Sequence, residues 1–148
     1  MNRKPIILQT TESGRLYFVQ TSDVEIVAPA APSAYAAVGS AVSVPNGTWV
    51  TVLSSTITLT AERYVMAWAD LSWHGGSSSV IGARISINGM NSPVRTQKSA
   101  GNDHGMAFSL SFRSGLLAAG TYTVTAAANV QAGPAINVDE GTLLALQA

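Results

Sequence analysis

The sequence contains no cysteine, which excludes disulfide bonds and thiolate metal sites. Charged residues are also scarce: they make up 11% of the 148 residues, against 47% hydrophobic residues. Lysine plus arginine and aspartate plus glutamate number eight each, so the formal net charge is zero and no net field attracts a polyanion. We therefore expect the fold to be held by packing and hydrogen bonds, and we do not expect nucleic acid as a partner.

Long apolar runs are missing too. The first apolar stretch, Ile6-Ile7-Leu8, is too short for the core of a signal peptide, and no later run reaches membrane-spanning length. We expect a soluble chain that is made in the cytoplasm, with no membrane partner. A monomer with so few charges would have little to cover its surface, whereas an oligomer hides part of that surface between subunits, so we also expect a homo-oligomer.

Period-two alternation and turn residues dominate what the sequence does contain. Tyr122, Val124 and Ala126 alternate with threonines, as a sheet with one buried face requires. Helical periodicity is almost absent, and this favours an antiparallel sandwich over a fold of alternating strands and helices. The pattern predicts turns at 45–47, 88–89 and 133–134, and strands at 42–44, 48–53, 56–60, 63–73, 80–87, 106–112, 120–130 and 135–146.

The first 35 residues differ from the rest of the chain. Short strand-like runs at 5–10, 15–20 and 23–28 are too few to form a core of their own and too apolar for a floating tail. A stiff Pro/Ala spacer, 29–34, follows them. We therefore predict an N-terminal attachment arm and linker at 1–35 and a body at 36–148, with the apolar arm residues Ile6, Leu8, Leu16, Phe18, Val24 and Ile26 docking on another protein.

The sequence carries no catalytic signature. Asp103 and His104, with Asp70 and His74, would supply the residue types of a hydrolytic triad or a metal site. However, no serine lies in a Gly-x-Ser-x-Gly elbow, and the two histidines lack the spacing of metal ligands. We therefore expect neither an enzyme nor a bound metal or cofactor.

Two segments that we predict to be loops, 73–79 and 99–104, are better candidates for recognition. They and their flanks offer an aromatic platform and polar groups suited to a sugar or a protein surface. The candidate residues are Trp73, His74, Arg95, Lys98, Asn102 and Asp103. The alternative, which we favour, is that Trp73 ends a strand by packing on the core while the polar residues face water.

With these segments in view, residues 42–146 resemble the small jelly-roll domains of the C1q/tumour-necrosis-factor-like type that recur in tailed-bacteriophage virion proteins. The segments that carry the resemblance are 44–52, 61–68, 83–89, 116–124 and 141–146. The resemblance implies an all-β antiparallel jelly-roll sandwich and a homotrimer. Tyr64, Met66, Trp68, Tyr122 and Val124 should then lie in strands, one alternating set filling the core and part of the remainder meeting neighbouring subunits.

Three functions are compatible with this sequence. The first is a capsid decoration, or cement, protein of a phage virion, in which a trimeric body is held on the major capsid protein by its arms. The second is a tail-fibre or head-fibre tip that binds a host receptor or glycan. The third, a small carbohydrate-active enzyme, lacks a recognisable carboxylate pair. We favour the first because 148 residues provide a knob and an arm but no heptad-bearing shaft.

Overall fold

The computed structural model describes residues 6–10, 16–20, 33–99 and 106–148. Every regular element in these ranges is a β-strand, which confirms the predicted all-β class. No helix in them is long and apolar enough to cross a membrane. The chain divides into two compact units, Met1–Ala30 and Ala31–Ala148.

The first unit contains a β-hairpin. Strand β1 (Ile6–Thr10) pairs antiparallel with β2 (Leu16–Gln20), and Leu8 lies opposite Phe18. These strands confirm the runs predicted at 5–10 and 15–20. The third predicted run, 23–28, which includes Val24 and Ile26, lies outside the described residues.

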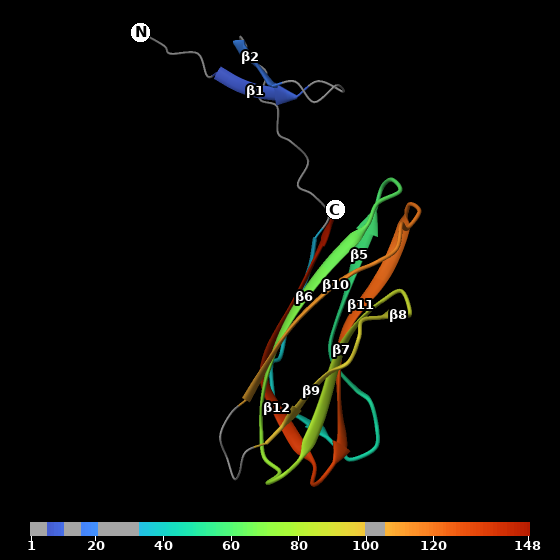
Figure 1. Ribbon diagram of the computed structural model, residues 1–148. Helices are drawn as coiled ribbons and strands as arrows, with labels where there is room; N and C mark the ends of the chain where they lie inside the picture. The colour runs from blue at the N-terminus through green and yellow to red at the C-terminus, as the bar shows by residue number, and fades with distance from the viewer. Residues whose placement is uncertain (1–5, 11–15, 21–32, 100–105) are drawn as a thin grey trace. The chain divides into compact units, whose positions relative to one another are not determined.

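The second unit, the body, is a sandwich of two antiparallel five-stranded sheets (Figure 1). In what we call the β6–β12 sheet the order is β10-β6-β12-β3, and β4 also pairs with β12. Its strands are β3 (Ser33–Ala37), β4 (Val42–Val44), β6 (Val65–His74), β10 (Met106–Arg113) and β12 (Ile136–Gln147).

The other sheet, the β7–β11 sheet, has the order β5-β11-β7-β8, and β9 also pairs with β7. Its strands are β5 (Val50–Leu59), β7 (Val80–Ile87), β8 (Met90–Asn91), β9 (Arg95–Lys98) and β11 (Gly120–Ala132). Side chains alternate between the two faces along each strand, and one face of each twisted sheet packs against the other sheet.

The core lies between the two sheets. Alternate residues of each long strand point inward, and the fully buried ones include Leu71, Trp73 and Leu143 from one sheet and Ile85 and Val124 from the other. Several inward positions carry only alanine, such as Ala67 and Ala145 on neighbouring strands. The residues between them point outward, so each sheet has one outer face available for other contacts.

Most strand predictions agree with the structure. Strand β7 has the predicted bounds, and the turn after it is formed by Asn88 and Gly89 with φ of 49° and 78°, the left-handed pair that a tight hairpin requires. Two predictions were wrong. The runs 48–53 and 56–60 form one strand, because Ser54 and Ser55 continue the pairing with β11, and Tyr64 lies just before β6 rather than in a strand.

Three strands were not predicted: β3, β8 and β9. Strand β3 begins at Ser33, three residues before the predicted start of the body at residue 36. It pairs along its whole length with β12, from Ser33 opposite Leu146 to Ala37 opposite Thr142. Residues 33–35 therefore contribute to a sheet of the body.

Candidate functional site

The outer face of the β6–β12 sheet carries a line of large apolar side chains. Leu144 on β12 lies opposite Trp68 on β6 and, on its other side, opposite Tyr35 on β3. Their exposed fractions are 39% for Leu144, 40% for Trp68 and 64% for Tyr35. We call these three residues the apolar row. Alternation places them outside because Ala67, Ala145 and Ala34, their neighbours along the strands, point into the core.

The apolar row has apolar neighbours on one side. Met66 and Leu146, which pair with each other across β6 and β12, are half-buried and lie two residues from Trp68 and Leu144 along their strands. Arg113 on β10, opposite Met66, stacks its guanidinium 4.4 Å from the ring centroid of Tyr64. The cation is thus held against an aromatic ring at the margin of the sheet.

On the other side of the apolar row the same face becomes polar. A shallow hollow of about 200 Å³ is lined by Asp70, Leu71, Ser72, Ala107, Glu140, Gly141 and Thr142. The hydroxyl of Ser109 donates a hydrogen bond of 2.6 Å to Oδ1 of Asp70, one of the lining residues. A β-bulge in β12 between Val138 and Glu140 leaves Asp139 as the extra residue. The hollow therefore holds two carboxylates but no aromatic side chain of its own.

The outer face of the β7–β11 sheet is different. Its outward positions on β5, β11 and β7 carry mostly hydroxyl side chains: Ser54, Thr56, Thr58, Ser86, Thr121, Thr123 and Thr125. The side-chain oxygens of Thr58 and Thr121, which lie opposite each other, are 2.9 Å apart. Farther along this sheet the guanidinium of Arg84 lies 4.1 Å from the ring centroid of Trp49. One large apolar side chain is exposed on this face: Val94, at 41% exposure, lies over Gly82 of β7.

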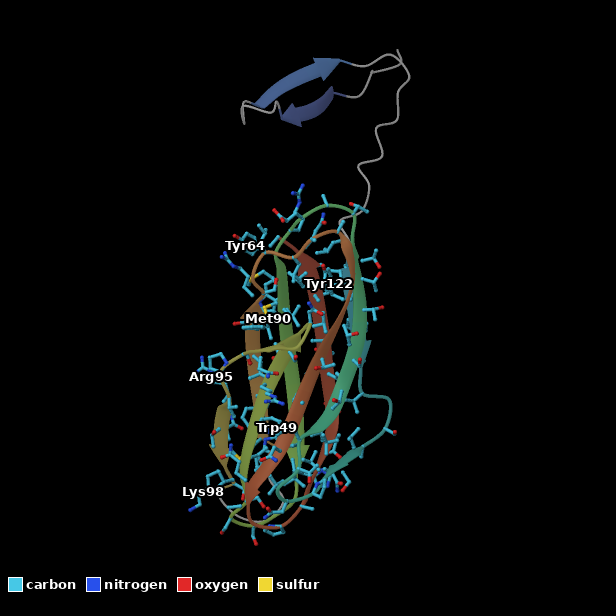
Figure 2. The ribbon with its side chains drawn as sticks, turned by 90° about the vertical axis from the view of Figure 1, so that its right-hand side faces the viewer. Trp49, Tyr64, Met90, Arg95, Lys98 and Tyr122 are labelled. Atoms are coloured by element: carbon cyan, nitrogen blue, oxygen red, sulfur yellow. The ribbon has the colours of Figure 1, made fainter. Side chains whose placement is uncertain are left out.

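The structure separates the residues that we expected in recognition loops. Trp73 is 1% exposed and belongs to β6, so its ring is not available as an exposed platform and packs in the core, as in the alternative that we favoured. His74 is the last residue of β6 rather than a loop residue. Arg95 and Lys98 are the two ends of strand β9, where both point away from the body (Figure 2). Asn102 and Asp103 lie outside the described residues.

The candidate catalytic residues are also separated. Nδ1 of His74 contacts Oδ2 of Asp139, and both side chains are partly exposed. The carboxylate of Asp70 accepts a hydrogen bond from the hydroxyl of Ser109. Along β6, Asp70 lies between Trp68 of the apolar row and Ser72. His104 is not among the described residues. Within 33–99 and 106–148 no three histidine, aspartate or glutamate side chains gather as metal ligands.

One end of the body is closed by a network of buried hydroxyl groups. The hydroxyl of Ser79 donates to the carbonyl of Pro134 at 2.7 Å, and the hydroxyl of Ser99 donates to the carbonyl of Gly76 at 2.7 Å. The backbone nitrogen of Ser79 donates to the hydroxyl of Ser99 at 3.0 Å. The first bond joins the loop before β7 to the turn before β12, and the other two join the same loop to the residue that follows β9. The hydroxyls are therefore used within the fold rather than offered to a ligand.

The comparisons with known proteins bear on the fold. No protein-family model matches the chain, and no curated protein matches its sequence. The structure of the tumour necrosis factor Eiger from S. frugiperda matches 80% of this chain and 94% of its own, with a TM-score of 0.52 and 12% identity. This similarity supports a jelly-roll, tumour-necrosis-factor-like fold and confirms the predicted jelly-roll architecture.

Two further structures match at lower scores. A family 35 carbohydrate-binding module from Clostridium thermocellum covers 74% of this chain and 90% of its own, with a TM-score of 0.40 and 16% identity. The structure of infectious bursal disease virus, Gt strain, covers 97% of this chain and has a TM-score of 0.46 with 14% identity. The present chain spans 38% of that viral chain.

Sequence reasoning identified only one member of the apolar row. It predicted that Met66 and Trp68 lie in a strand and that part of the outward set meets neighbouring subunits. The pairings that place Leu144 between Tyr35 and Trp68 join residues that are far apart in the sequence. The available signal was a single large aromatic residue between two alanines, Tyr35 in one strand and Trp68 in another, whereas Leu144 stands among other leucines and gave no such signal.

Proposed function

We propose that this chain is a non-enzymatic structural protein of a phage virion: a homotrimeric capsid decoration protein that binds the major capsid protein through its N-terminal arm. The body would form the trimeric knob, and the hairpin of the first unit would attach it to the head shell. No metal or cofactor takes part in this proposal. The virion location and the phage origin rest on the sequence resemblance described above.

The hairpin β1–β2 is the observation that carries the attachment. Two antiparallel strands alone are marginally stable in water and need a further strand or a packing partner. Within the described part of the first unit, each strand pairs only with the other, which leaves one edge of each strand unpaired. An unpaired edge is a template on which another sheet can add a strand. A shell protein would supply that partner.

Deletion of residues 1–30 tests the attachment. The deletion stops before Ser33 because β3 pairs with β12 and belongs to the body. We expect the truncated protein to fold, to keep its oligomeric state, and to lose at least about tenfold in affinity for purified shells that lack the protein. Arg95→Ala and Lys98→Ala in the full chain are the controls, because both residues lie on the exposed strand β9, and they should bind shells like the unaltered protein.

Two outcomes would contradict the proposal. Truncated protein that still decorates shells would show that the arm is not the attachment segment. Particles that lack the protein should also rupture at lower temperature, because a ligand that binds only the assembled shell stabilises that state by mass action. Unchanged shell stability together with lost adsorption to host cells would instead favour a fibre tip that binds a receptor.

A further inference from the structure

We infer that the outer face of the β7–β11 sheet carries a binding site for an acidic sugar, in which Arg84 holds the carboxylate of the ligand. The site is centred on the stacked pair of Trp49 and Arg84. We call these two residues, together with Asn129 and Gln131, the Trp49 patch. The inference goes beyond the proposed function, because it depends neither on attachment through the arm nor on the association of copies.

The Trp49 patch lies on a floor of small residues. Ala127 and Asn129 occupy outward positions of β11, because their neighbours along the strand pack in the core. They are nevertheless only 8% and 7% exposed, so other side chains cover them. Val50 lies opposite Ala128, and the register therefore places Trp49, the residue before it, on the outer side next to Asn129. Figure 2 shows Trp49 beside β11 in a view of this sheet.

Arg84 has a cationic group without an anionic partner. Its guanidinium lies over the ring of Trp49, 4.1 Å from the centroid. A guanidinium held in this way keeps N–H donors at its edge, and these match the two oxygen atoms of a carboxylate. Within 33–99 and 106–148 no carboxylate lies at ion-pair distance from Arg84, although its side chain is half-buried. Partial burial strengthens the attraction between such a cation and an anion that binds it.

The charges of the two sheets favour an anion on this side of the body. The strands of the β7–β11 sheet carry three cations and no carboxylate: Arg84, Arg95 and Lys98. The strands of the other sheet carry three carboxylates and one arginine: Asp70, Asp139, Glu140 and Arg113. An anionic ligand is therefore attracted to the β7–β11 sheet and repelled from the other.

The neutral groups beside Arg84 favour a sugar as the carrier of the carboxylate. A Cβ atom at Gly82, two residues from Arg84 and opposite Asn129, would lie 2.7 Å from Nε2 of Gln131, so the amide of Gln131 lies over β7. An amide donates and accepts hydrogen bonds, as sugar hydroxyl groups require. The patch extends roughly 10 Å across three strands and roughly 7 Å along them. This area suits one or two sugar rings and is far below the roughly 800 Å² per partner of a stable protein complex.

The experiment titrates the full-length protein with a hexamer of galacturonic acid and follows the indole N–H signal of Trp49 by NMR. Loss of one indole signal in Trp49→Phe assigns it. We expect a saturable shift with a Kd of about 1 mM or lower. Arg84→Met keeps an unbranched side chain over the ring but removes the charge, and it should weaken binding at least about tenfold. Gln131→Ala, at an exposed side chain, should weaken it about threefold and tests the site even if Arg84→Met does not fold.

Arg113→Met is the matched control. Arg113 also lies over an aromatic ring, 4.4 Å from the centroid of Tyr64, but it belongs to the sheet that carries the carboxylates. We expect this substitution to change the Kd by less than about twofold. Thermal melting of both methionine variants separates loss of the site from loss of the fold. Deletion of residues 1–30 should leave sugar binding unchanged, so failure of the attachment proposal is distinguishable.

Four results would overturn the inference. The first is the absence of a saturable shift up to about 10 mM of the acidic hexamer. The second is equal weakening by Arg84→Met and Arg113→Met. The third is equal affinity for a neutral hexamer of glucose, because the carboxylate would then play no part. The fourth is equal affinity for hexaglutamate, which would assign the Trp49 patch to an acidic segment of a protein rather than to a sugar.

Discussion

On the β6–β12 sheet the outward positions of three neighbouring strands carry Tyr35, Leu144 and Trp68, whereas on the β7–β11 sheet the outward positions of β5 and β11 carry threonine and serine. Both faces follow from the same alternation, because every second residue of a strand leaves the core. The difference shows that alternation decides which residues face outward, but not what covers them. Threonine satisfies an outer position in water through its hydroxyl, whereas exposed tryptophan and leucine in one line are stabilised only when another surface covers them.

The first and largest effect should come from the shared core, where the two sheets ought to behave alike. Leu71→Ala beneath the apolar face and Ile85→Ala beneath the hydroxyl face both truncate fully buried side chains. Each should lower the free energy of unfolding by about 2–5 kcal/mol. Urea denaturation of both variants measures this cost. A large cost on one side and almost none on the other would show that the two sheets do not share one core.

A smaller effect should come from the hydroxyl network that joins the two sheets at one end. Ser79→Ala removes the buried hydroxyl that donates to the carbonyl of Pro134. We expect a loss of about 0.5–1.5 kcal/mol in the free energy of unfolding, the contribution of one intramolecular hydrogen bond. Ser54→Ala, at an exposed serine of β5, is the control and should change stability by less than about 0.5 kcal/mol. Equal effects of the two substitutions would mean that the network adds nothing to the connection between sheets.

The smallest effects on stability should come from substitutions on the two outer faces themselves. Thr58→Val removes one hydroxyl of the exposed pair with Thr121, and we expect less than about 0.5 kcal/mol at any protein concentration. Leu144→Ser should be equally mild in dilute solution. At high concentration it should lower the melting temperature relative to the unaltered protein, because it weakens association and therefore the stabilisation by mass action. A melting temperature of the unaltered protein that is independent of concentration would contradict the difference between the faces.

The sequence predicted the long strands well because their signals are local. Alternation and the Asn88-Gly89 turn give the bounds of β7, and Gly133-Pro134 separates β11 from β12. Strand β3 was missed because its five residues, mostly alanine, follow a proline-containing segment and resemble a linker. Strand β9 was missed because Arg95 and Lys98 suggest a solvated loop, although its backbone pairs with β7.

The candidate site was harder to predict for a physical reason. Which outward residues become neighbours depends on the register between strands, and in this body the relevant pairings join β3 and β6 to β12. A single sequence contains no local signal for that register. Trp73 illustrates the same limit: beside His74 and the glycines it resembles a loop aromatic, yet the phase of β6 turns it inward with Val65 and Leu71.

The place of β12 in the topology has a consequence for how the chain acquires its structure. This strand lies in the interior of its sheet, between β6 on one side and β3 and β4 on the other, so the first strands of the body have no partner in that sheet until residues 136–147 arrive. During synthesis, the backbone groups of β3 and of one edge of β6 therefore remain unpaired until β12 has been made. Folding of such a body requires closure of very long loops and is expected on the slow side of the millisecond-to-second range. A ribosome that stalls before β12 would therefore release a chain with open strand edges, the form most prone to aggregate.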